Sequence, residues 1–184
     1  MSAQDVGVVI VAAGTGSRVG GAELKQFRWV AGKPMLLHSV QLFQARPDVG
    51  MVVCVLPRSV IGDPPPWLFQ SDTERLLLSV GGATRQDSVS NGLEDLPSDL
   101  SVIVVHDAAR PLVPDAVVTR VITEARTGRS AIAALPVVDT LKEVDAEDAS
   151  GAPCPASGCG VRKRPRPFRG ISCCAHTPRR GPWD

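Results

Sequence analysis

The sequence lacks the features that mark several classes of protein. No apolar run approaches the roughly 20 residues that a membrane-spanning helix needs. The first segment carries Asp5 in place of a basic region, and its short apolar run ends in glycines, so we expect no secretory signal and a cytoplasmic protein. The formal net charge is only +1, which argues against a nucleic-acid footprint over the whole chain.

Cysteine is scarce until the end of the chain, where the composition changes abruptly. Residues 1–150 have a net charge of −5, whereas residues 151–184 have +6 and hold four of the 5 cysteines and six of the 16 prolines. This change predicts one domain over 1–150 and a separate tail over 151–184. The isolated Cys54 lies in an apolar run, which favours a buried thiol over a disulfide framework.

Short apolar runs alternate with helical patterns over residues 1–150. The runs are too short for helices and suit strands buried on both faces; they cover 6–12, 51–56, 76–80, 102–105 and 131–137. Between several of them, apolar residues recur at helical spacing, over 34–43, 88–96 and 114–125. This alternation predicts parallel β-α-β units, and hence a three-layer α/β/α sandwich with a mostly parallel, Rossmann-like sheet.

Ligands of such sheets bind where the strands end, at their carboxyl edge. Three segments leave a predicted strand and become polar or glycine-rich at that point: 12–18, 81–88 and 106–111. We expect these three segments to converge on one site.

The first of these segments is glycine-rich but matches neither common phosphate-binding pattern. The dinucleotide pattern G-x-G-x-x-G would need glycine where the chain has Val19, and the Walker pattern would need Lys and Ser or Thr at positions 22 and 23. The backbone N–H groups of such a turn can still cradle phosphate oxygens. The cations Arg18 and Lys25 flank it, which suits a reaction that builds negative charge on phosphorus. A tight turn with two surface cations is the alternative interpretation.

Five motifs then follow one another along the chain. They are A-A-G-T-G-S-R (12–18) with L-K-Q (24–26), G-K-P-M-L-L-H-S-V (32–40), G-G-A-T-R-Q-D-S-V (81–89), V-H-D-A-A-R-P (105–111) and P-V-V-D-T-L-K (136–142). Together they resemble the 2-C-methyl-D-erythritol 4-phosphate cytidylyltransferase family of the nucleotidyltransferase superfamily. The resemblance implies an enzyme of isoprenoid precursor synthesis that transfers CMP from CTP to 2-C-methyl-D-erythritol 4-phosphate and releases pyrophosphate.

The resemblance also implies roles for residues of the two glycine loops. The first loop would wrap the CTP phosphates and the edge of the base, with Arg18 and Lys25 as the catalytic cations at the α-phosphate. The second loop would meet cytosine and ribose; a plain strand-to-helix turn is the alternative interpretation. The nucleotide-binding residues implied in this way are Ala12, Ala13, Gly14, Thr15, Gly16, Gly81, Gly82, Arg85 and Ser88.

Asp107 directly follows a predicted strand, where a carboxylate can hold Mg²⁺ that bridges phosphate oxygens. The resemblance implies that Asp107 binds this cofactor and the polyol phosphate, together with Arg110; a local ion pair between the two is the alternative. Thr140 would begin a projecting β-arm that reaches the substrate of a neighbouring subunit, which implies a homodimer. We expect His106 to be structural.

The match to the family stops after Val144, so we expect a sheet truncated at the β-arm and a chain that does not turn over as it stands. A ribitol-5-phosphate cytidylyltransferase and a truncated, inactive CTP-binding fragment are the alternatives.

Residues 151–184 show no periodicity, and we expect disorder there. Out-of-frame translation of a GC-rich gene is our first interpretation of this tail. The second is a zinc-binding knot, which would use Cys154, Cys159, Cys173, Cys174 and His176. The third is a basic arm for nucleic acid at 162–166.

Overall fold

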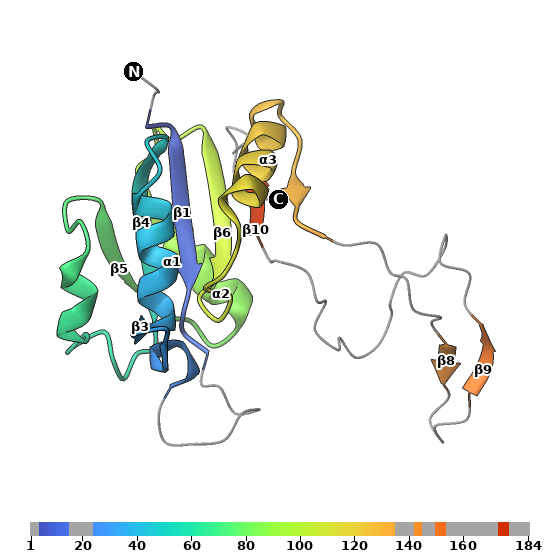
Figure 1. The fold of residues 1–184 in the computed structure, drawn as a ribbon, viewed down its shortest axis with the longest axis horizontal. Coiled ribbons are helices and arrows are strands. Elements are labelled where there is room, and N and C mark those ends of the chain that lie inside the picture. The colour runs from blue at the N-terminus through green and yellow to red at the C-terminus, as the bar shows by residue number, and fades with distance from the viewer. Residues whose placement is uncertain (1–3, 15–23, 135–141, 145–149, 154–172, 177–184) are drawn as a thin grey trace. The chain divides into compact units, whose positions relative to one another are not determined.

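The computed structural model describes residues 4–14, 24–134, 142–144, 150–153 and 173–176. The chain forms two compact units. The first, Met1–Ala133 with Ile171–Asp184, holds a six-stranded sheet, and the second, Ala134–Gly170, holds a two-stranded one (Figure 1). Among the described residues, no helix is long and apolar enough to cross a membrane.

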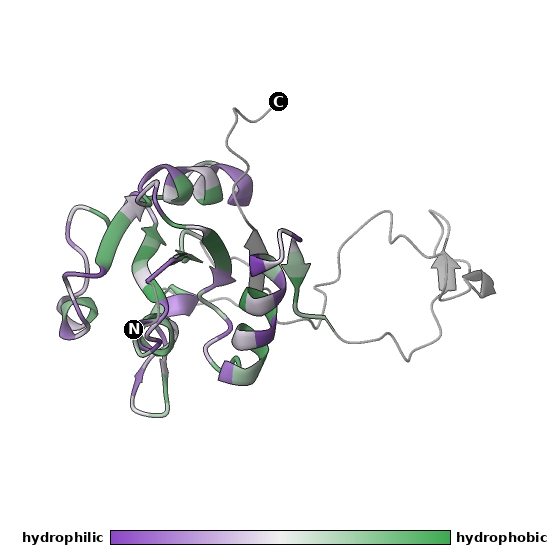
Figure 2. Cartoon of the chain, turned by 90° about the horizontal axis from the view of Figure 1, so that it is seen from above, coloured by the Kyte–Doolittle hydropathy of each residue, from purple (hydrophilic) through white to green (hydrophobic). Residues whose placement is uncertain are grey.

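The main sheet is mostly parallel, as predicted. Its strand order is β5 (Leu76–Val80), β4 (Val49–Leu56), β1 (Val6–Val11), β6 (Val102–Asp107), β10 (Cys173–His176) and β7 (Ala131–Ile132). The first four strands run parallel to one another, and β10 runs antiparallel to both β6 and β7. Figure 2 shows the largely hydrophobic colouring of the parallel strands between helices of mixed colouring.

Helices cover both faces of the sheet. Helices α1 (Met35–Gln44) and α3 (Asp115–Arg126) pack on the face that carries Val8 and Ile10, whereas α2 (Arg85–Glu94) packs on the opposite face with Val9. A Cβ atom on Gly92 of α2 would lie 2.6 Å from a methyl group of Val9, so only glycine permits this close approach. The three-layer α/β/α fold is therefore confirmed.

Two short helical turns and a small hairpin complete the first unit. Turn η1 (Lys25–Phe27) precedes the hairpin of β2 (Trp29–Val30) and β3 (Lys33–Pro34), and η2 (Pro66–Gln70) lies between β4 and β5. The buried core includes Cys54, which is 0% exposed, and burial raises the pKa of its thiol to about 12. The predicted buried thiol is thus confirmed.

The end of the chain departs from the sequence-based expectation. Strand β9 (Ser150–Pro153) pairs with β8 (Lys142–Val144) across the predicted boundary, and the contacts divide the chain at Ala134 and Gly170 instead. The structure has short strands at residues 151–153 and 173–176, within the tail for which the sequence predicts disorder. Strand β10 supplies hydrogen-bond partners for the outer edge of β6, and such main-chain pairing needs no side-chain pattern that a sequence would reveal. The other residues of the tail lie outside the described ranges.

Candidate functional site

The ends of β1, β5 and β6 lie at one edge of the sheet because these strands are parallel. Strand β1 is hydrogen-bonded to β4 on one side and to β6 on the other, so the chain leaves β1 in one direction and later returns on its other side. Open α/β sheets bind ligands at such a switch point. The predicted convergence of the three segments is confirmed for their described residues by two contacts, Ala13 with Gly81 and Arg85 with Asp107.

The first loop begins directly after β1. Ala12 is buried, and its N–H donates to the carbonyl oxygen of Val55 over 2.9 Å. The side-chain amide of Gln26 donates to the carbonyl oxygens of Ala12 at 2.5 Å and Gly14 at 3.2 Å. Gln26 belongs to the L-K-Q motif, but its residue type and spacing alone indicated no role for its side chain.

Several of the predicted site residues lie outside the described ranges. They are Thr15, Gly16, Arg18 and Thr140. Their assignments remain predictions.

Lys25 is carried by turn η1, next to Gln26. Lys25 is half-buried, whereas Gln26 is only 5% exposed. The next residue, Phe27, packs edge-on against Trp67 with ring centroids 5.5 Å apart. The turn is thus held on one side by the first loop and on the other by an aromatic contact, which fixes the backbone of Lys25 beside the glycine loop.

The second loop packs tightly against the first. A Cβ atom on Gly81 would lie 2.3 Å from the Cβ of Ala13, so no larger residue fits at position 81. The N–H of Gly81 donates to the Leu56 carbonyl oxygen at 2.8 Å, and the N–H of Gly82 donates to the Ser88 hydroxyl at 3.1 Å.

Ser88 helps to shape this loop from within. It is 2% exposed, and its hydroxyl donates to the carbonyl oxygen of Thr84 at 2.9 Å while it accepts the N–H of Gly82. Thr84 and Asp87 form a reciprocal capping box that starts α2 three residues before the predicted helix. A direct contact of Ser88 with a nucleotide remains a prediction; the structure gives the residue a supporting task in the loop.

Asp107 ends β6 and is bonded to two arginines from the predicted site. Its Oδ1 accepts from Nη2 of Arg85 at 2.8 Å and from Nε at 3.2 Å, and its Oδ2 accepts from Nε of Arg110 at 3.3 Å. The local ion pair with Arg110 is thus present, and Arg85 adds a link to the second loop. The Asp107 side chain is 26% exposed, so ligands can still approach its carboxylate.

His106 supports the same turn from the core. It is 0% exposed, and burial lowers the pKa of its ring to about 4, so the ring is neutral at pH 7. Its Nε2 lies 3.2 Å from the carbonyl oxygen of Arg110 and 3.4 Å from the hydroxyl of Ser39, and its ring packs edge-on against Phe43. These contacts agree with the structural role expected from the sequence.

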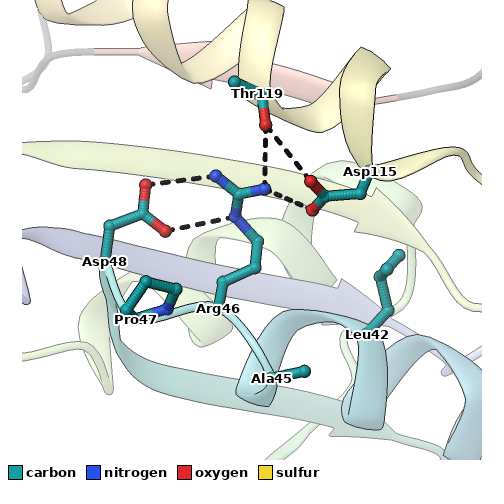
Figure 3. Close-up of a pocket in the computed structure, with 7 residues that line it drawn as sticks. All are labelled: Leu42, Ala45, Arg46, Pro47, Asp48, Asp115 and Thr119. Atoms are coloured by element: carbon teal, nitrogen blue, oxygen red, sulfur yellow. Dashed lines mark hydrogen bonds and ion pairs between the residues drawn. The ribbon is translucent and has the colours of Figure 1, made fainter.

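A pocket at the other end of the strands is lined in part by paired charges (Figure 3). Arg46 donates to both carboxylate oxygens of Asp48, at 3.1 and 3.2 Å, to the carboxylate of Asp115 and to the hydroxyl of Thr119. Asp48 directly precedes β4, so this cluster lies at the amino edge of the sheet. We name it the amino-edge clasp and assign it a role in stability, because its charges already have partners.

Comparisons with known proteins agree with the geometry. The sequence model of the family "2-C-methyl-D-erythritol 4-phosphate cytidylyltransferase" matches residues 6–152. The protein of that name from Streptomyces coelicolor is 41% identical over 162 residues, which are 86% of this chain and 60% of the relative. A "Bifunctional enzyme IspD/IspF" from Desulfotalea psychrophila is 36% identical over 135 residues, which are 73% of this chain and 35% of that protein.

Solved structures support the same grouping. A 2-C-methyl-D-erythritol 4-phosphate cytidylyltransferase from Thermus thermophilus is 29% identical with a TM-score of 0.66, covering 92% of this chain and 69% of that structure. A 4-diphosphocytidyl-2C-methyl-D-erythritol synthase from Anaerococcus prevotii has a TM-score of 0.73 at 17% identity, covers 94% of this chain and 70% of that structure, and supports the fold alone. Since the family model spans well over half of its residues, the chain belongs to the 2-C-methyl-D-erythritol 4-phosphate cytidylyltransferase family.

Proposed function

We propose that the chain is the CTP-binding part of an enzyme that transfers CMP from CTP to 2-C-methyl-D-erythritol 4-phosphate and releases pyrophosphate. The observation that carries the proposal is the meeting of three loops at the switch point, where Gly81 abuts Ala13 and Arg85 bonds Asp107. Family membership gives the substrate class. The chain spans only 60% of its Streptomyces coelicolor relative. The activity of the complete enzyme is therefore part of what we propose.

The chemistry needs positioning and charge more than it needs a base. An anionic oxygen of the polyol phosphate attacks the α-phosphorus in line, the bond from that phosphorus to the bridging oxygen breaks, and pyrophosphate leaves. The attacking oxygen is already deprotonated. Lys25 and Arg18 would neutralise charge that develops at the α-phosphate, and the loss of one such group typically costs about 10²–10³-fold in rate.

The second loop supports recognition of cytosine through its backbone. The N–H groups of Gly81 and Gly82 are already bonded to Leu56 and Ser88. We therefore assign recognition of the base to the backbone carbonyl oxygens of the second loop. They would accept a hydrogen bond from the amino group of cytosine. Uracil has a carbonyl at that position and would be rejected.

We propose Mg²⁺ as the cofactor, with Asp107 as its protein ligand. Mg²⁺ commonly takes one or two carboxylates together with oxygens of substrate phosphates. Within the described part of the chain, no three His, Cys, Asp or Glu side chains form a metal-ligand group. A single, partly exposed carboxylate fits a cation that is held jointly with the nucleotide. When bound, the cation would supply positive charge for the triphosphate oxygens, and Arg85 would have to release Oδ1 of Asp107.

We also propose a cytoplasmic homodimer in which Asp107, Arg110 and Thr140 bind the polyol phosphate. The hairpin of β8 and β9 supports this proposal, because it lies in the segment where the family resemblance expects a projecting arm. Sedimentation of the purified chain tests the dimer. A monomer at every concentration would contradict it.

Binding and turnover together test the proposed activity. Calorimetry measures CTP affinity in the presence of Mg²⁺, and a coupled assay measures pyrophosphate release with 2-C-methyl-D-erythritol 4-phosphate or ribitol 5-phosphate. Release with the first substrate supports the proposal, and release with ribitol 5-phosphate alone supports the alternative substrate. CTP binding without release identifies an inactive fragment. Failure to bind CTP overturns the proposal.

A further inference from the structure

We propose that Gln26 is a positioning residue whose amide sets the distance between the first glycine loop and the turn that carries Lys25. The inference rests on the proposed function, because it concerns the place where the CTP phosphates would bind. It gives a role to a buried, neutral side chain that the sequence did not single out as a site residue.

The amide bridges two carbonyl groups of the loop. The Nε2 atom has two hydrogens, and the carbonyl oxygens of Ala12 and Gly14 lie 2.5 and 3.2 Å from it, so one hydrogen is available for each. Gln26 is only 5% exposed, so water does not readily replace these bonds. Neither Ala12 nor Gly14 can reorient its carbonyl group without breaking one of these bonds.

Holding the Ala12 carbonyl also orients the next N–H group. The C=O of one residue and the N–H of the next point in opposite directions across a trans peptide bond, and the described residues contain no cis peptide. With the Ala12 carbonyl turned toward Gln26, the N–H of Ala13 faces the opposite side of the loop. Glycine-rich loops bind phosphate through N–H groups presented in this way.

The backbone of Gln26 is also constrained, because it lies within turn η1. Turn η1 is closed by bonds from the N–H of Phe27 to the Leu24 carbonyl at 2.9 Å and from the N–H of Arg28 to the Lys25 carbonyl at 3.3 Å. Any movement of Gln26 therefore displaces Lys25 as well. Because the amide is uncharged, it fixes the loop without competing with Lys25 for a phosphate.

Three variants at position 26 test this role. Gln26→Met keeps the length and removes the donor, Gln26→Glu keeps the shape but places oxygens against the two carbonyls, and Gln26→Asn keeps a donor on a shorter side chain. Gln44→Met is the matched control. Gln44 is also buried, at 8% exposed, and its amide bonds the backbone of Asp72 at 2.7 and 3.1 Å, so the control removes a similar amide elsewhere in the fold.

Calorimetry then compares CTP with CMP, which lacks the two outer phosphates. For Gln26→Met we expect CTP affinity to fall about tenfold, the size expected for two lost hydrogen bonds, and CMP affinity to change much less. The loss of CTP affinity should be larger for Gln26→Glu and smaller for Gln26→Asn. Gln44→Met should lower the unfolding temperature and leave the ratio of the two affinities unchanged, which separates positioning from stability.

The outcomes distinguish this inference from the function on which it rests. If the unaltered chain binds CTP and the folded variants at position 26 keep its ratio of CTP to CMP affinity, the positioning role of Gln26 is overturned and the proposed function stands. If the unaltered chain binds no CTP, both are overturned. If Gln26→Met does not fold, the Gln26→Asn variant decides between the same two results.

Discussion

At the candidate site, buried polar side chains hold the loops in place through hydrogen bonds to the loop backbone. Gln26 does so for the first loop, Ser88 for the second and His106 for the turn after β6. None of the three contacts would be evident from spacing alone, because each depends on how close the fold brings a backbone group. The glycines and charged residues of the same loops could be predicted, since their chemistry is visible in their type.

The cation Lys25 gives the first test at this scale. Lys25→Ala should weaken CTP binding at least tenfold, since a hydrogen bond between charged groups is lost. Adding Arg18→Ala should weaken it further. Arg120→Ala, which removes an exposed charge on α3, is the control for the change in net charge. Unchanged calorimetric affinity in the double variant would contradict the assignment of both residues.

The carboxylate of Asp107 gives the second test at the residue scale. Arg85 and a divalent cation cannot both occupy its Oδ1 atom, so Arg85→Gln should strengthen the binding of Mn²⁺, used as a probe for Mg²⁺, by about threefold, as suits a partly exposed ion pair. Asp107→Asn should abolish that binding. Electron paramagnetic resonance measures free Mn²⁺ without any need for turnover, and equal affinity in Arg85→Gln and the unaltered chain would disprove the competition.

At the scale of elements, the sequence predicted that helix α2 exists but not where it begins. Its apolar spacing predicted a helix over 88–96, but the structure begins it at Arg85. The capping box of Thr84 and Asp87 was present in the sequence and would have placed this start. Helix α1, by contrast, begins one residue after Pro34, close to its predicted position.

The amino-edge clasp joins the segment before β4 to helix α3. Asp48 is only 9% exposed and bonds both Arg46 and Arg126. Asp48→Ala should lower the free energy of unfolding by about 2–3 kcal/mol, because it leaves two cations without this partner in a partly buried setting. Urea unfolding measures the loss. Asp72→Ala, which breaks the more exposed pair with Arg75, should have a smaller effect, and equal losses would contradict a special role for the clasp.

The start of β1 contributes a pH-dependent contact with the end of α3. The Arg126 guanidinium, aided by the Ser101 hydroxyl, holds the pKa of Asp5 below its ordinary value of 3.8, against the opposing effect of burial. The stability from this contact is therefore full above pH 3.8 and is lost as the pH falls through the lowered pKa. Asp5→Asn should cost about 1 kcal/mol at neutral pH in urea unfolding. That difference should shrink in strong acid, and a constant difference would refute the linkage.

At the scale of the whole molecule, the sheet combines strands from distant parts of the sequence. The parallel strands followed from the alternation of strands and helices, but their order did not. Strand β10 was not predicted either, because pairing through the main chain leaves no pattern in four residues. Ala175 lies at the register position between Val104 of β6 and Ala131 of β7.

This arrangement predicts that proline is not tolerated within β10. Ala175→Pro should lower the free energy of unfolding by about 3 kcal/mol, because proline removes a ladder hydrogen bond from a strand that is paired on both sides. Thermal unfolding measures the loss, and Arg169→Pro, placed before β10, is the control. Equal stability of Ala175→Pro and the unaltered chain would mean that residues 173–176 contribute nothing to the sheet.

Strand β10 is the last of the strands in this sheet to be synthesised. Strands β1, β4, β5 and β6 leave the ribosome first. Among the described residues, the outer edge of β6 pairs with residues 173–176, which emerge later. An open strand edge readily pairs with another chain. We therefore expect pairing of this edge with another chain to compete with completion of the sheet while the protein is being synthesised.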